Sequence, residues 1–173
     1  MDIFIEILRI IIPSLAIMVV TFYLVRSFLK NNERMRNTEY MIRSHEITVP
    51  LRLQAYERLT LFLERISLDS LLMRCNQPGM NSRQLHTELL NTIRSEYEHN
   101  LSQQVYMSVQ TWEMVKNARA QMIKIINTAA EKTNPVLPAI ELSKKILENM
   151  GEYQKSPTQT ALDFIKSEIQ QLF

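Results

Sequence analysis

Glycine is nearly absent from this chain, which has only Gly79 and Gly151 among its 173 residues. Average usage near 7 per cent would give about twelve. Sheet proteins need glycine at hairpins and bulges, and phosphate-binding loops and nucleophile elbows need several glycines at fixed spacing. The shortage excludes those motifs. Together with abundant Leu, Ile, Met, Glu, Gln, Lys and Arg, it predicts an all-α fold.

The sequence has only one cysteine, Cys75, so cysteine is even scarcer than glycine. A single cysteine excludes a disulfide framework and fits a reducing compartment. Arg74 lies beside Cys75 at a predicted helix end, where a thiol can be activated. A lone cysteine in such a compartment more commonly behaves as a small buried apolar residue, and we favour that interpretation.

Most of the chain has no excess of basic or acidic residues, although its net charge is +2. Residues 26–58 carry seven basic and four acidic side chains, whereas residues 59–173 carry twelve of each. A nucleic-acid-binding domain keeps its basic residues on the folded domain, so we expect no nucleic acid as a partner. Basic residues beside an apolar run favour contact with anionic lipid instead.

The longest uncharged stretch covers residues 10–25, with Arg9 before it and Arg26 after it. Apolar residues continue outward, so residues 3–29 would form a helix about 40 Å long. The hydrocarbon core of a bilayer is about 30 Å thick. The stretch has no polar face, so we predict a transmembrane helix over about residues 5–27; a buried core helix and an interfacial helix are the alternatives.

The N-terminal segment lacks the features of a cleaved leader. Asp2 and Glu6 precede the apolar run, and no A-x-A-like site follows it, so residues 1–30 are expected to remain as an anchor. Basic residues are commoner after the run than before it, which predicts an outside N-terminus and a cytoplasmic C-terminal part. The membrane-flanking candidates are Arg9, Arg26, Lys30, Arg34 and Arg36.

Residues 31–50 are predicted to be a juxtamembrane basic helix or linker. This segment either continues the anchor helix or follows a short break at Asn31-Asn32, and Pro50 is expected to end or kink it. Residues 51–173 are numerous enough to bury a core, so one helical domain is expected there.

Turn signals divide residues 51–173 into helices. A helix over about residues 51–75 precedes a type II turn with Pro78 and Gly79 at its centre. We expect Ser82 to cap the next helix. Two further helices are expected, one over residues 138–150 and one that begins at Ser156-Pro157, with Pro138 at the start of the first and Gly151 as its left-handed cap.

Residues 83–133 contain no proline or glycine and could form one rod. Their apolar residues recur every fourth position from Leu85 to Val105, although a turn has 3.6 residues. Five such steps rotate the apolar stripe by about 200°, which would turn it toward water in a straight helix. We therefore predict a break near residues 99–108, with Ser108 capping the helix that follows.

Chemistry-bearing residues are sparse. Glu96 and His99 form an E-x-x-H pair on one helical face, but a di-iron bundle needs two such pairs and two further glutamates. His45 and His86 have no partner at ligand spacing. We therefore predict no catalytic residue, metal or cofactor. At the chain end, Leu172 and Phe173 are apolar where ends are usually polar, so we expect them to pack on the protein itself or on a partner.

Eight short runs are informative when they are taken together: residues 51–59, 62–66, 76–80, 90–94, 99–100, 102–104, 112–113 and 115–119. Together they resemble a family of uncharacterised single-pass proteins from Bacteroidota. The resemblance covers nearly the whole chain and implies a bacterial inner-membrane location, but it supplies no catalytic residues.

Two classes of function remain open from the sequence. We expect a membrane-anchored helical interaction protein, an adaptor or accessory subunit of an inner-membrane assembly that could form homo-oligomers, with no catalysis. The alternative is a small helical-bundle enzyme, or a ligand- or metal-binding protein, tethered to the membrane. Convergent polar side chains on facing helices would favour the alternative.

Overall fold

The computed structural model describes the backbone of residues 2–172 and the side chains of residues 15, 17–33, 35–36, 39, 41–43 and 45–171. These residues form α-helices, one short 3-10 helix and a single isolated bridge between Asn81 and Pro138. The prediction of an all-α fold is therefore confirmed. Contacts between Cα atoms divide the chain into two units, residues 1–49 and residues 50–173.

Helix α1 (Asp2–Arg65) runs through both Asn31-Asn32 and Pro50. Of the two outcomes predicted at Pro50, an end or a kink, the end of the helix is therefore wrong. A proline inside a helix removes one backbone hydrogen bond and costs about 3 kcal/mol, so other contacts must offset it. Residues after Pro50 supply them, because Leu59 and Leu63 are completely buried in the core.

In the first unit, every described side chain from residue 15 to residue 48 is exposed. Among the residues whose side chains the structure describes, no helix is both long and apolar enough to cross a membrane. Much of the predicted span, including Arg9, lies outside those residues, as does the side chain of Arg34. Arg26, Lys30 and Arg36 are exposed on α1.

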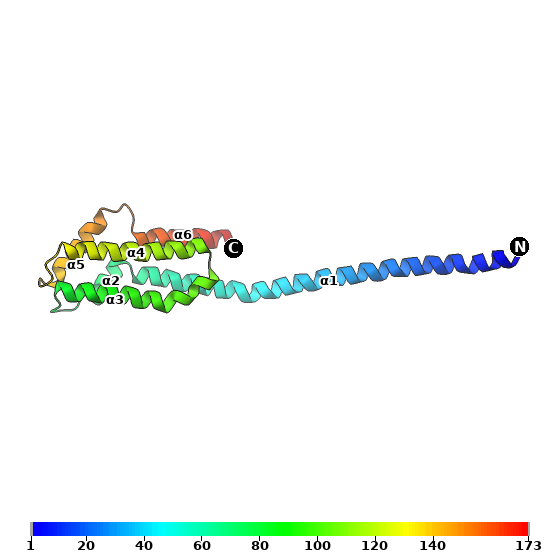
Figure 1. Ribbon diagram of the computed structural model, residues 1–173, viewed down its shortest axis with the longest axis horizontal. Helices are drawn as coiled ribbons and strands as arrows, with labels where there is room; N and C mark the ends of the chain where they lie inside the picture. Colours follow the sequence, from blue (N-terminus) through cyan, green and yellow to red (C-terminus); the bar gives the residue numbers. More distant parts are fainter. Residues whose placement is uncertain (1, 173) are drawn as a thin grey trace. The chain divides into compact units, whose positions relative to one another are not determined.

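The second unit is a helical bundle around one apolar core (Figure 1). Its members after α1 are α2 (Leu68–Cys75), α3 (Ser82–Asn100), η1 (Leu101–Tyr106), α4 (Val109–Glu131), α5 (Ala139–Gly151) and α6 (Pro157–Leu172). Helix α4 packs against α3, α5 and α6, and α3 also packs against α2 and α5. Helices α3 and α4 therefore make most of the packing between helices of the bundle.

Every α-helix of the bundle contributes side chains to the core, whereas η1 has no buried residue. The last part of α1 contributes a row of buried side chains, and α3 and α4 contribute buried side chains at helical spacing. The largest fully buried side chains are Tyr56, Leu59, Phe62, Leu63, Ile66, Leu71, Leu85, Leu89, Ile93, Met122, Ile126 and Leu142.

The predicted break between α3 and α4 is confirmed. Helix α3 ends at Asn100, η1 follows, and the Ser108 hydroxyl accepts a hydrogen bond of 3.1 Å from the amide of Thr111 at the start of α4. The reason is the rotation of the apolar stripe. Leu85, Leu89 and Ile93 are completely buried, whereas Val105 is 74 % exposed.

The prediction of a single helix over residues 51–75 is wrong. Helix α1 ends at Arg65 and α2 begins at Leu68. Between them the Ser67 hydroxyl donates a hydrogen bond of 2.7 Å to the carbonyl oxygen of Glu64. Serine competes in this way with the backbone bonds of a helix. The break lets both Ile66 and Leu68 enter the core.

The turn before α3 forms as predicted, since Gly79 has a φ of 84° and the amide of Met80 bonds the carbonyl oxygen of Gln77. The cap of α3 is not Ser82 but Asn81, which forms a capping box with Gln84. The Ser82 hydroxyl instead donates to carbonyl oxygens of the segment before α5.

The last two helices begin where the sequence indicates. Pro138 is the cap residue of α5, and α6 begins at Pro157. The prediction that Gly151 caps α5 in a left-handed conformation is wrong. Gly151 lies inside the helix, and Gly79 is the one described residue with positive φ.

We predict that a chain without residues 1–30 folds alone and unfolds cooperatively, because the core lies entirely within residues 50–173. In that background Met122→Ala should lower the free energy of unfolding by about 2–5 kcal/mol, since it empties a fully buried site. Lys124→Ala, on the exposed face of α4, should change it by less than about 0.5 kcal/mol. Urea titration followed by circular dichroism measures both, and a gradual non-cooperative transition would contradict the prediction.

Candidate functional sites

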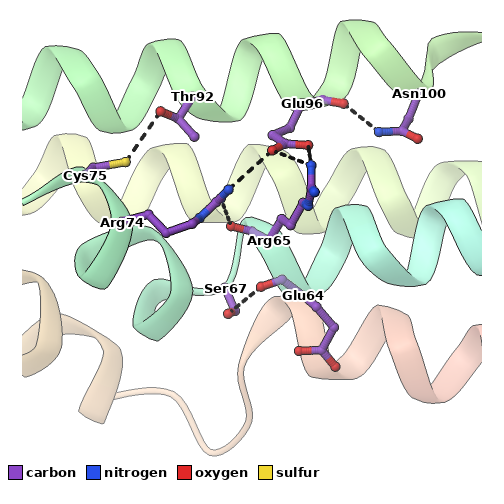
Figure 2. A network of polar contacts seen from close by, with 8 residues as sticks. All are labelled: Glu64, Arg65, Ser67, Arg74, Cys75, Thr92, Glu96 and Asn100. Carbon is purple, nitrogen blue, oxygen red and sulfur yellow. Dashed lines mark hydrogen bonds and ion pairs between the residues drawn. The ribbon is translucent and has the colours of Figure 1, made fainter.

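Glu96 on α3 joins the two helices that flank the break at Ser67 (Figure 2). Its Oε1 accepts from Arg65 Nη1 at 3.2 Å and from Arg74 Nη1 at 3.4 Å. Arg74 Nη2 also donates to the carbonyl oxygen of Arg65 at 2.7 Å, which satisfies a backbone group at the end of α1. The cluster therefore holds α1, α2 and α3 together.

The two residues of the E-x-x-H pair have different surroundings. Glu96 is engaged by two guanidinium groups, and His99 is exposed at the edge of a shallow hollow of about 320 Å³. Among the described residues, no group of three or more His, Cys, Asp or Glu side chains could hold a metal ion. The pair belongs to the ionic surface between α1 and α3.

Cys75 is buried, and its Sγ lies 3.4 Å from the Thr92 hydroxyl (Figure 2). The Arg74 guanidinium bonds Glu96 and the Arg65 carbonyl oxygen. Arg74 is therefore committed to positions other than the thiol. The interpretation of Cys75 as a small buried residue is confirmed.

Glu168 on α6 accepts hydrogen bonds from three different residues. One oxygen accepts from the Tyr56 hydroxyl of α1. The other accepts from Ser108 Oγ at 2.5 Å and from the Thr111 hydroxyl at the start of α4. Three hydroxyl donors from two helices and a cap thus converge on one carboxylate.

The hydroxyl groups set the protonation of this site. Burial raises the pKa of Glu168, but the hydrogen bonds from Ser108, Thr111 and Tyr56 outweigh it, so the pKa lies below its ordinary value. Burial and the bond to Glu168 raise the pKa of Tyr56, against the opposing effect of Arg52. The site therefore holds an ionised carboxylate and a neutral phenol at neutral pH.

Our sequence reasoning missed the Glu168 site, although a signal was present. Glu168 lies three residues after Ile165 and so falls on the apolar face of the last helix. An acidic residue on a buried face needs hydrogen-bond donors. The sequence could not say which helices supply them, because Tyr56, Ser108 and Thr111 are more than fifty residues away.

An aromatic stack fills the space between α1, α3 and α4. The Tyr97 ring lies 6.0 Å from the Phe62 ring and 5.7 Å from the Trp112 ring, measured between centroids. The Arg119 guanidinium lies 4.0 Å from the Tyr97 centroid, a cation–π geometry. Trp112 is part of the core.

A polar cleft of about 430 Å³ lies between α3, α4 and the segment before α5. His86 Nε2 is 2.8 Å from Asn127 Oδ1 at its wall. The cleft brings together ionisable and polar groups that the sequence keeps apart. Its lining residues are Ser82, Arg83, His86, Asn127, Ala130, Glu131, Thr133, Pro135 and Leu142.

The predicted packing of the apolar chain end concerns residues that the structure does not describe. Phe173 and the side chain of Leu172 lie outside the described residues. The preceding residue of the same apolar face, Ile169, packs against the core, and Ile165 is almost completely buried.

The model of a family described as "Family of unknown function (DUF7935)" matches residues 2–172. The chain belongs to this family. The match covers both units, which confirms that the sequence runs quoted above belong to an uncharacterised family. No curated protein and no solved structure matches the chain.

We predict that Glu168→Gln weakens the bundle at neutral pH and flattens its acid unfolding profile. A carboxyl whose pKa is lowered by folding adds stability above its unfolded pKa, and this is lost as pH falls through the folded pKa. The loss at pH 7 should be about 1–3 kcal/mol, as for removal of charged hydrogen bonds.

Urea titrations of the wild type and the variant at pH 7, 5, 4 and 3 would measure the difference. Glu98→Gln is the matched control, because Glu98 is exposed on α3. Parallel pH curves for the wild type and Glu168→Gln would show that the three hydroxyls do not stabilise the ionised carboxylate.

Proposed function

We propose that this protein is a membrane-anchored helical interaction protein of the Bacteroidota inner membrane. In this proposal residues 5–27 cross the bilayer, and the bundle of residues 50–173 lies in the cytoplasm. The bundle acts as an adaptor or accessory subunit of a larger inner-membrane assembly. Its partners are lipid on one segment and protein on others.

One observation supports this proposal more than any other. The described part of α1 before residue 49 carries many large apolar side chains, and all of them are exposed. Helices that are apolar all round belong in lipid or against another protein. The residues concerned include Leu15, Ile17, Met18, Val19, Val20, Phe22, Tyr23, Leu24, Val25, Phe28 and Leu29.

The polar clusters of the bundle favour an interaction role over catalysis. Glu96 bridges two arginines, and Glu168 is bonded by three hydroxyls. Each carboxylate is thus engaged in joining helices. Cys75 is buried against Thr92, which leaves it poorly placed to act as a nucleophile.

The anchor is tested by fractionation. The full chain should stay in the membrane pellet after carbonate washing, and a chain without residues 1–30 should not. Val19→Arg should release part of the protein, because an arginine near the centre of a span costs about 2.5–3.5 kcal/mol. Ile47→Arg, an equivalent exchange outside the predicted span, should have no effect. Full release of the unaltered chain would contradict the proposal.

The orientation and the partner need separate measurements. A reporter fused after Phe173 should behave as cytoplasmic, because basic residues follow the apolar run. Crosslinking in the native membrane, followed by purification and mass spectrometry, should recover a defined inner-membrane protein. Activity of a periplasmic reporter at this position would reverse the orientation.

The polar cleft supports a second candidate, a tethered ligand-binding bundle. Arg83, His86 and Glu131 place a guanidinium, an imidazole and a carboxylate around one hollow. A zwitterionic small molecule would match that combination. If the cleft binds one, a panel of amino acids should include a compound that raises the melting temperature of the wild type but not of His86→Ala. No stabilisation by any of them would remove this candidate.

A further inference from the structure

The part of α1 before the bundle has a seven-residue repeat. Phe28, Met35, Ile42 and Val49 follow one another at intervals of seven. The first three are 69 %, 58 % and 54 % exposed, so nothing in the described chain covers them. An apolar residue every seventh position is one of the two rows that form a coiled-coil seam, conventionally called position a.

The second row of such a seam, position d, is also recognisable. In this register it holds Ile17, Leu24, Asn31, Thr38 and His45. Residues 26–49 contain eight Lys, Arg, Asp and Glu side chains, and none of them falls at a or d. The charged residues therefore leave free the one stripe that a partner helix would cover.

We infer that residues 24–49 of α1 pair with the same segment of a second copy of this chain, as a parallel two-stranded coiled coil. The seam buries Leu24, Phe28, Met35, Ile42 and Val49 of both copies. The repeat of 3.5 residues per turn keeps these positions facing a partner that supercoils with the same pitch.

The residues beside the seam select the parallel arrangement. In a parallel pair, position g of one helix meets position e of its partner five residues later. Residue 34 is an arginine at g, and residue 39 is a glutamate at e, so these positions carry opposite charges. Glu46 is also at e, and an antiparallel pair would bring e positions of the two copies together, where like charges repel.

The polar d residues define the register. Asn31 and His45 would face their counterparts across the seam, and a polar seam residue fixes register at a cost in stability. Ile42 and Val49 are β-branched residues at a, which favours two strands where leucine stands at d, as Leu24 does in this register. The proposed membrane anchor would orient both copies alike and raise their effective concentration, although the pairing does not depend on it.

Crosslinking in the full chain tests the pairing. Cys75→Ala supplies a background without cysteine. Single cysteines then replace Met35 or Ile42 at position a, and Glu33 at f or Arg43 at b serve as outward-facing controls. A short bismaleimide should give covalent dimers from the a positions, at about tenfold higher yield than from the controls.

Three results would overturn the pairing: equal yields at a and at the outward positions, no dimer at any position, or a product whose mass shows a different protein. Circular dichroism and melting of each variant should match the background, because the substitutions lie outside residues 50–173. A variant that fails this check is replaced by a cysteine at Leu24 or Val49, which belong to the same seam.

A charge exchange tests the direction. In the Ile42→Cys chain, Glu39→Arg should lower the dimer yield, and adding Arg34→Glu should restore it. Failure of the double exchange to restore the yield would exclude the parallel register. These outcomes are independent of the anchor, since carbonate release would refute the membrane proposal while crosslinking at position a would persist in solution.

Discussion

The buried face of α1 from Tyr56 to Leu63 is the contact on which the bundle depends. It meets α3 through the tilted rings of Phe62 and Tyr97, and it meets α6 through the hydrogen bond from Tyr56 to Glu168. Helices α3 and α4 pack against each other and contribute buried side chains to the same core, so loss of the α1 face would expose apolar surface on both. After the break at Ser67, the next helix, α2, packs against α3.

Polar contacts in this protein stabilise places where helices change direction. Glu96 joins Arg65 and Arg74 across the break between α1 and α2, and Glu168 accepts from the residues that begin α4. Hydroxyl-bonded carboxylates add directional bonds where apolar burial alone would not fix the helix ends. These clusters support the fold, and the interaction role proposed for the protein rests on the uncovered apolar surface of α1.

Local signals predicted some boundaries and not others. Ser108, Pro157 and the Pro78-Gly79 turn act through their own backbone, so the sequence placed them correctly. The break at Ser67 and the continuation of α1 through Pro50 could not be predicted in this way. Both depend on how much apolar surface neighbouring residues bury against helices distant in sequence. The helical conformation of Gly151 could not be predicted from local signals either, because glycine permits a left-handed cap without requiring one.

The sequence by itself determined the all-helical fold, the turns at short-range signals and the charge-free seam of α1, because composition and periodicity act within a few residues. Only the tertiary structure decided which polar groups meet. Tyr56, Ser108 and Thr111 reach Glu168 from distant parts of the chain, and Glu131 of α4 shares a cleft with Arg83 and His86 of α3. Such groups converge through the packing of helix faces, and that packing depends on the shape of the whole core.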